Sequence, residues 1–185
     1  MKKVFFLITA ISIFTLTVNA QDKAFTKTGN ISFYSKTSME NIEAHNKKAT
    51  AILDSKTGQI EFALLMKAFE FEKALMEEHF NENYVESDKF PKSTFKGKID
   101  NLSSVNFSKD GSYPVTVSGD LTIHGVTKPV TSKGAIAISG GKISAKSQFD
   151  ILLSDYNISI PAVVKENISN NVQIFVELSL EALTQ

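Results

Sequence analysis

The chain has 185 residues, with 20 basic and 20 acidic side chains and no cysteine. Every basic residue is lysine, so the chain offers no disulfide bond, no thiolate chemistry and no arginine-rich footprint for nucleic acid. Arginine is also the preferred bidentate clamp for phosphates and carboxylates, and its absence argues against a small anionic substrate.

The first predicted element is a secretory signal peptide at residues 1–20. Lys2 and Lys3 form a short basic region, an apolar run follows at residues 4–18, and Ala20 ends a small-residue cleavage site. The apolar run is shorter than the roughly 20 residues of a membrane-spanning helix. We therefore expect cleavage after Ala20, no stable membrane insertion, and a periplasmic or secreted protein. No cysteine follows the cleavage site, which excludes a lipid anchor through a lipobox cysteine.

The remaining residues, 21–185, are expected to form one domain. This stretch is long enough to bury a core without disulfide bonds. Its eighteen lysines stand against twenty acidic residues, so its surface is close to neutral. No internal repeat, low-complexity tract or linker divides it.

An alternation of apolar and polar residues with period two predicts the first strands. A short strand at residues 30–35 comes first, and a second at 49–53 ends in the turn sequence 54–58. That turn closes a hairpin with a third strand at 60–66. Residues 69–71 continue the third strand after a phase shift of one residue, which indicates a β-bulge.

A helical spacing replaces the alternation at residues 75–80. The apolar stripe consists of Leu75, Met76, His79 and Phe80. It is only about two turns long, so it must pack against another element to be stable. The polar loop that follows, residues 81–93, is rich in turn-forming residues and contains two aromatic side chains. It either packs against the barrel or acts as a lid.

Five further strands are predicted in the second half of the chain. They span residues 95–99, 115–123, 126–138, 143–151 and 172–180. His124 and Gly125 join two of them through a tight turn, and Gly140 and Gly141 form the next turn. Eight strands with one apolar face each and short connections predict an all-β fold, an eight-stranded antiparallel barrel or a strongly curved sandwich, with one short helix.

The interior of an eight-stranded barrel either fills with side chains or holds one small ligand. The chain is rich in phenylalanine, with 14 residues, and small residues stand at inward positions. These are Gly97, Gly119, Ala145 and Ser147. Small inward residues leave space unless a large side chain opposite fills it. This favours a cavity, although a solid core remains open.

Three phrases resemble the YceI family of secreted bacterial proteins. They are LMEEHFNENYVESDKFPKSTFKG at residues 75–97, GDLTIHGVTKPV at 119–130 and FDILLSDYNISIPAVV at 149–164. The resemblance covers the chain from about residue 29 to its end. It implies a lipocalin-like barrel around a long, narrow tunnel that binds a polyisoprenoid, an isoprenoid quinone or another lipid. No cofactor is implied apart from such a ligand.

The resemblance also implies which side chains line the tunnel. The expected ligand-binding residues are Phe62, Leu64, Met66, Leu75, Met76, Phe80, Tyr84, Phe95, Val117, Leu121, Phe149, Ile151, Tyr156 and Ile174. They would bury an apolar chain at about 25 cal/mol per Å² removed from water. A polar head group would meet Tyr84, Asn81, Asn83 or Tyr156 at the mouth. Ordinary core packing is the alternative for each residue.

The leading hypothesis is a secreted, non-enzymatic binding protein that transports, stores or sequesters a lipid. The alternative is a solid-cored barrel in the cell envelope that serves as an interaction or structural module. Such a module would form a homodimer through an exposed strand edge.

An enzyme is disfavoured because the candidate catalytic groups lack a productive spacing. Glu77, Glu78 and His79 are adjacent, but no second histidine follows four residues away as a zincin helix requires. No serine occupies a G-x-S-x-G nucleophile elbow. We expect His79 to pack at the boundary between helix and barrel, His124 to be exposed or to cap a backbone, and His45 to be solvated. No metal site and no catalytic residue are expected.

Overall fold

The computed structural model describes residues 22–182, so the predicted signal peptide at residues 1–20 lies outside the described residues. Nine strands account for most of the described chain. They are β1 (Lys23–Lys36), β2 (Asn41–Asp54), β3 (Gln59–Leu65), β4 (Glu70–Phe71), β5 (Lys92–Ile99), β6 (Gly111–Ile123), β7 (Val126–Ser139), β8 (Lys142–Leu152) and β9 (Asn171–Ala182).

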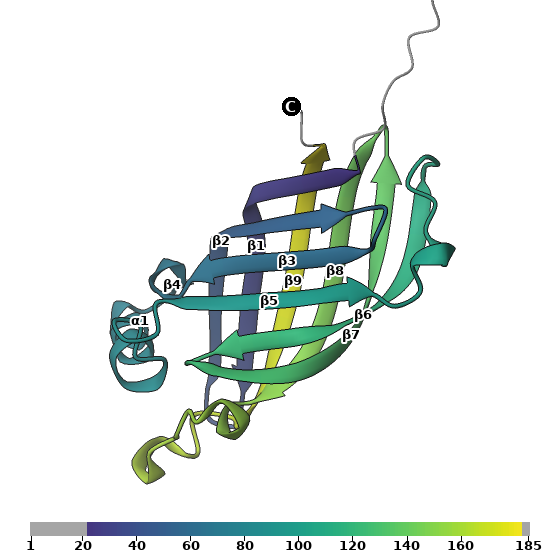
Figure 1. Ribbon diagram of the computed structural model, residues 1–185. Coiled ribbons are helices and arrows are strands. Elements are labelled where there is room, and N and C mark those ends of the chain that lie inside the picture. The colour runs from purple at the N-terminus through teal and green to yellow at the C-terminus, as the bar shows by residue number, and fades with distance from the viewer. Residues whose placement is uncertain (1–21, 183–185) are drawn as a thin grey trace, which may run out of the picture.

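Eight of these strands close into one antiparallel barrel (Figure 1). The order around the barrel is β1-β9-β8-β7-β6-β5-β3-β2, and β2 pairs back with β1. The two-residue strand β4 only extends the edge of β2. The predicted eight-stranded antiparallel barrel is therefore confirmed, and the curved sandwich is excluded because closure leaves no open edge along these eight strands.

The first two strands are longer than the sequence predicts, because irregular register hides their alternation. The pairing of β1 with β2 shifts on both sides of Gly29. A Cβ atom at Gly29 would lie 2.7 Å from a methyl carbon of Leu178 and 3.1 Å from the Ala49 carbonyl oxygen, so glycine allows a close approach of the strands here. In β2, the buried Asn46 donates a hydrogen bond to the Leu65 carbonyl (2.9 Å) and accepts one from the Lys48 amide (3.0 Å). A buried asparagine whose side-chain amide is hydrogen-bonded at both its nitrogen and its oxygen thus stands where the alternation would place an apolar residue.

The predicted bulge after the third strand is wrong. A 3₁₀ turn, Met66–Ala68, ends β3, and the chain then pairs with β2 through β4. The turn produces the same phase shift as a bulge would, because it adds residues without extending the strand. Phe69 and Phe71 still reach the interior after it.

The short helix forms where the stripe predicts it, but a different set of side chains faces the barrel. Helix α1 (Ala74–His79) continues as a π-helical turn, Phe80–Tyr84. Met76, Phe80 and Tyr84 face the interior. Leu75 is 61% exposed, and His79 is exposed, so the predicted inward position of both residues is wrong. Only the Met76 and Phe80 side of the predicted stripe faces inward, and Tyr84 continues it one turn later.

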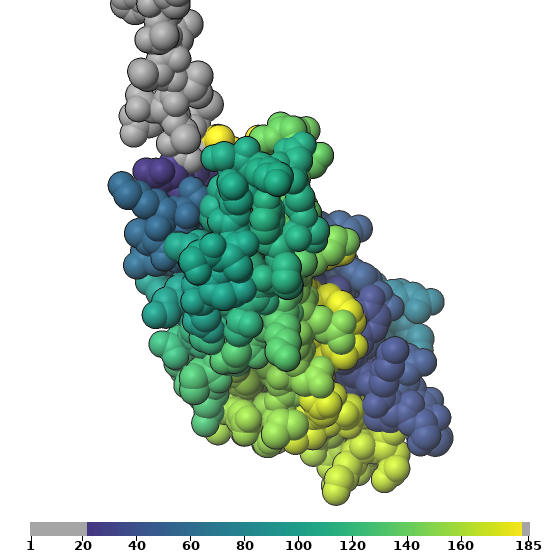
Figure 2. All heavy atoms as spheres, turned by 90° about the vertical axis from the view of Figure 1, so that its right-hand side faces the viewer, coloured from purple at the N-terminus to yellow at the C-terminus, as the bar shows by residue number. Residues whose placement is uncertain are grey.

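The two ends of the barrel differ in what covers them. Helix α1 and the segment between β8 and β9 lie toward one end (Figure 1). That segment carries the 3₁₀ turns Leu153–Tyr156 and Ala162–Val164. Toward the opposite end, seen in Figure 2, the loop between β5 and β6 covers part of the surface, and its half-buried Leu102, Val105 and Phe107 pack on the core. Among residues 22–182, no helix has the length and apolar character needed to span a bilayer.

Candidate ligand-binding site

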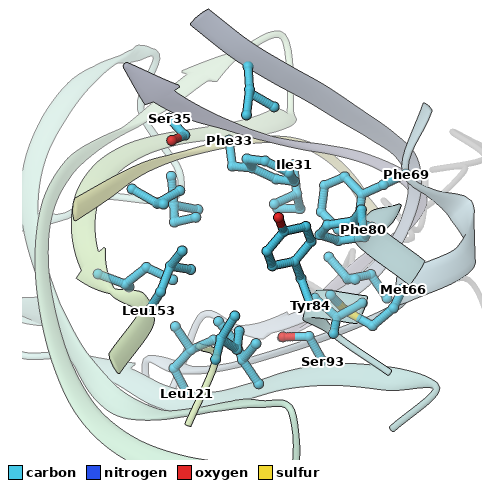
Figure 3. A pocket seen from close by; sticks show the side chains of 18 of the residues that line it. Ile31, Phe33, Ser35, Met66, Phe69, Phe80, Tyr84, Ser93, Leu121 and Leu153 are labelled. Carbon is cyan, nitrogen blue, oxygen red and sulfur yellow. The ribbon is translucent and has the colours of Figure 1, made fainter. Parts of the chain in front are cut away.

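A cavity lies inside the barrel at the end where α1 packs. Its volume is about 140 Å³, measured as the space open to the centre of a water molecule. One water needs roughly 10–15 Å³ by this measure, so the cavity is far larger than an ordinary packing gap. Side chains from strands all around the barrel and from α1 converge on it (Figure 3).

Four aromatic rings form one wall of this cavity and hold the helix in place. Phe80 packs against Phe33, Phe69 and Phe71, with ring centroids 5.1 to 5.6 Å apart. Phe33 also contacts Phe69 edge-on at 5.3 Å. Such aromatic pairs contribute about 0.5–1.5 kcal/mol each beyond the area that they bury. The cluster explains why so short a helix is stable, and it gives the cavity a rigid apolar side.

Polar groups are rare in the lining. In the described part of the chain, they are limited to the hydroxyls of Ser35, Tyr84 and Ser93, and none of the charged side chains described there lines this cavity. Ser93 donates its hydroxyl to the Thr122 carbonyl (2.9 Å), and the Ser35 hydroxyl accepts a hydrogen bond from the Ser169 amide (2.9 Å). Two of the three hydroxyls are therefore already engaged with the protein.

Tyr84 is the exception among these polar groups. Its hydroxyl points into the cavity (Figure 3) and has no hydrogen-bond partner in the described part of the chain. Burial raises the pKa of the Tyr84 phenol, so the group stays neutral at physiological pH. It offers a neutral donor and acceptor to whatever occupies the cavity.

A second, smaller cavity of about 60 Å³ continues the interior toward the opposite end. Its lining includes Leu53, Ile60, Ile99 and Val176 together with the hydroxyls of Ser132 and Ser147, which bond to each other. The barrel is therefore hollow at two levels, and the solid core left open by the sequence is not what forms.

Most residues expected at the site do lie inside the barrel. The first cavity is lined by Phe62, Leu64, Met66, Met76, Phe80, Tyr84, Leu121, Phe149, Ile151 and Ile174. The second is lined by Phe95 and Val117, and again by Phe62 and Phe149. Their contact with a ligand stays a prediction.

Two of the expected residues lie elsewhere. Leu75 is exposed and lines neither cavity. Tyr156 is only 2% exposed and lies in the core behind the cavity wall, with no partner for its hydroxyl in the described chain. Burial raises the pKa of the Tyr156 phenol. Asn81 donates to the Glu77 carbonyl (2.9 Å) and Asn83 is exposed, so their contact with a head group stays a prediction.

Several lining residues were missed by the sequence analysis. They include Ile31, Phe33, Ser35, Ile42, Phe69, Phe71, Val85, Ser93, Ile123, Leu153, Ile158, Ile168 and Val172. The strand members of this set share the period-two pattern of the predicted residues, so that pattern was a usable signal. Ile158 and Ile168 belong to the irregular segment between β8 and β9, where no period exists to reveal an inward side chain.

The expected space at Gly97 and Gly119 is filled. These residues face each other across β5 and β6, and the ring of Phe95 lies over both. A Cβ atom at Gly97 would lie 2.5 Å from Cζ of that ring, and one at Gly119 would lie 2.8 Å from it. The glycines thus make room for an aromatic ring rather than for a ligand.

His124 joins three loops at the α1 end of the barrel. It stands at the β6–β7 turn with a φ of 51°, and its side chain is only 10% exposed. One ring nitrogen lies 3.0 Å from the Tyr156 carbonyl, and the other lies 2.7 Å from a carboxylate oxygen of Glu86. The ring also packs edge-on against Phe90. Of the two expected alternatives, exposure or contact with the backbone, the structure shows the second.

The other two histidines form no comparable site. His45 lies 2.7 Å from the Glu43 carboxylate and is 38% exposed, and His79 makes no side-chain hydrogen bond within residues 22–182. Within the same residues, no group of three or more histidine, aspartate or glutamate side chains is arranged to hold a metal ion.

The sequence profile of the YceI-like domain matches residues 11–180. None of the curated proteins matches the chain. Among solved structures, a polyisoprenoid-binding domain from Saccharophagus degradans, implicated in plant cell wall breakdown, superposes with a TM-score of 0.76 at 14% identity over 89% of this chain and 100% of that domain.

Two other solved structures share the fold. BcnA of Burkholderia cenocepacia has a TM-score of 0.68 at 19% identity, covering 83% of this chain and 96% of its own. The YceI protein of Campylobacter jejuni has a TM-score of 0.56 at 15% identity, with both chains fully covered. At these identities the likeness concerns the fold of the barrel.

Proposed function

The chain belongs to the YceI-like domain family, and we propose that it is a secreted, non-enzymatic protein that holds one long apolar ligand inside its barrel. The ligand class is a polyisoprenoid, an isoprenoid quinone or another lipid. The observation that carries this proposal is the composition of the first cavity, whose lining is apolar apart from three hydroxyls. Such a lining suits the non-directional burial of a hydrocarbon chain.

The relatives support the same class of ligand. One solved structure of this fold is a polyisoprenoid-binding domain. The cavity also favours a carrier over an interaction module. An unfilled interior loses packing energy, and a module that binds no ligand gains nothing in return. The signal peptide expected at residues 1–20 would deliver the carrier to the periplasm or the medium, where lipids need a shielded path through water.

The polar end of the ligand has one suitable partner in the cavity. The Tyr84 hydroxyl is unpaired in the described chain and points inward. It would donate to or accept from a neutral head group, such as a carbonyl or an alcohol. A phosphate would find no cationic side chain in this lining. From this distribution of polar groups, we expect a neutral head group to lie inside the cavity and a charged head group to stay outside it.

The proposal is tested by filling the cavity with a larger side chain. Leu153 lines the first cavity, whereas its neighbour Leu152 is 43% exposed. We expect L153W to weaken binding of a long prenyl alcohol such as solanesol by about tenfold or more, equivalent to at least about 1.4 kcal/mol. L152W adds the same side chain outside the barrel and should bind as the unmodified protein does.

Binding is measured by displacement of a fluorescent polyene fatty acid, with circular dichroism to show that each variant is folded. Saturable displacement by solanesol that is lost in L153W and kept in L152W supports a ligand inside the barrel. No saturable displacement, or equal loss in both variants, would contradict it.

A further inference from the structure

Phe62 and Phe149 stand between the two cavities. Among residues 22–182, they are the only two that the linings share. Along β3, the inward residues change from the second cavity at Ile60 to the first at Leu64, with Phe62 between them. Along β8, Phe149 marks the same change between Ser147 and Ile151. The two rings therefore lie at the same height along the barrel axis, where the first cavity ends and the second begins.

A third ring, that of Phe95, packs beside Phe62 and supports it from one side. Phe62 stacks on Phe95, with ring centroids 5.1 Å apart and planes 17° apart. Phe95 in turn lies over Gly97 and Gly119, where a Cβ atom would lie 2.5 and 2.8 Å from Cζ of its ring. Phe95 is buried in this position. Phe95 is thus the constrained ring of the three, whereas Phe62 borders both cavities.

Phe149 is less constrained than Phe95. It lies opposite Ile174 on β9 and is only partly buried, with a cavity on each side of its ring. Phe62 is also partly buried and borders both cavities. A ring with free space on both sides can turn about its χ angles without displacing packed neighbours, and the cost of leaving a preferred rotamer is of the order of 1 kcal/mol.

We propose that Phe62 and Phe149 form a movable partition that sets the length of apolar chain which the barrel accepts. A short chain fills the first cavity and leaves the rings in place. A long chain turns them aside and extends into the second cavity, so it binds at the cost of that rearrangement. This inference rests on the proposed function and adds the feature that determines ligand length.

The test is a chain-length series on partition variants. F149A and F62A each remove one ring and join the two cavities. We expect the affinity for solanesol to rise by about tenfold in F149A, because the partition no longer needs to open. The affinity for geraniol, a short chain expected to stay in the first cavity, should change much less. F149L keeps the site apolar with a smaller side chain and should give an intermediate shift, so the comparison does not depend on one variant.

The matched control is F175A. Phe175 packs on Tyr34, with ring centroids 5.0 Å apart, and lines neither cavity, so its loss removes a ring without opening the partition. F175A should bind the whole series of prenyl alcohols with an unchanged preference between long and short chains. The proposal is overturned if F149A and F62A show the same length preference as the unmodified protein or as F175A. If no prenyl alcohol of any length binds the unmodified protein, the proposed function fails as well, and the two failures are thereby distinguished.

Discussion

At the scale of single residues, the strained positions of the backbone gather around one histidine. The non-glycine residues with positive φ within residues 22–182 are Glu86, His124 and Asn157. Glu86 and His124 are hydrogen-bonded to each other, and Asn157 follows the Tyr156 carbonyl that His124 contacts. His124 thus contacts a backbone carbonyl with one ring nitrogen and a carboxylate with the other. His124 thereby compensates for strain in three loops.

The carboxylate of Glu86 makes this contact sensitive to acid. The hydrogen bond from His124 lowers the pKa of Glu86 below its ordinary value of 4.5. A carboxylate with a lowered pKa in the folded state contributes stability above its unfolded pKa, and that stability is lost as the pH falls through the folded pKa. We expect E86Q to lower the melting temperature at neutral pH and to show a smaller drop on acidification than the unmodified protein.

Thermal unfolding followed across this acid range measures the difference. The control is E82Q, which removes an exposed carboxylate from the neighbouring π-helical turn without touching His124. Its curve should follow that of the unmodified protein. If the E86Q curve coincides with the curves of E82Q and the unmodified protein, the contact between Glu86 and His124 does not stabilise the loops.

At the scale of elements, β5 and β6 approach each other more closely than two ordinary strands because glycines face across them. A Cβ atom at Gly119 would lie 2.4 Å from the Lys96 carbonyl oxygen and 2.5 Å from Cα of Gly97. G119A should therefore destabilise the barrel by about 1–3 kcal/mol, the usual cost of overpacking. The free energy of unfolding in urea measures this.

Gly111 on the same strand provides the comparison. Its nearest contact would be the hydroxyl end of Tyr113 at 3.3 Å, which can move aside, and G111A should change the stability by no more than about 0.5 kcal/mol. Equal effects of the two substitutions would mean that the close approach of β5 and β6 contributes nothing specific.

The elements also show what periodicity reveals and what it hides. Strands β5 to β9 alternate cleanly, so the sequence predicts their existence and their inward faces. At Gly29 and Asn46 the pattern fails, because a bulge and a buried amide interrupt the alternation. In α1 the stripe was too short to determine its phase, and only the aromatic cluster around Phe80 determines which face turns inward.

At the scale of the whole molecule, loops from distant parts of the chain are joined around the end that holds the first cavity. Glu40, in the turn between β1 and β2, contacts Lys73 before α1 (3.3 Å) and Asn167 before β9 (3.2 Å). His124 joins the β6–β7 turn to two further loops. These contacts give the cavity a defined wall, although the loops that form it have little regular structure.

Whether the barrel is hollow was beyond the reach of the sequence. The same phenylalanines fill a solid core or line a cavity, and the outcome depends on which rings meet across strands. Phe95 filled the space that Gly97 and Gly119 were expected to leave, whereas Phe62 and Phe149 left space on both sides. Which ring fills which space depends on how neighbouring strands are aligned, and the sequence of a single strand does not determine that alignment.

The central claim is that an apolar ligand occupies the barrel, and native mass spectrometry tests it most directly. The protein is purified under gentle conditions from the cells that produce it, and any released molecule is identified by fragmentation. We expect one lipid per chain in the unmodified protein and in L152W, and a much smaller liganded fraction in L153W. An unliganded mass for the unmodified protein, together with failure to take up prenyl alcohols or quinones, would contradict the claim.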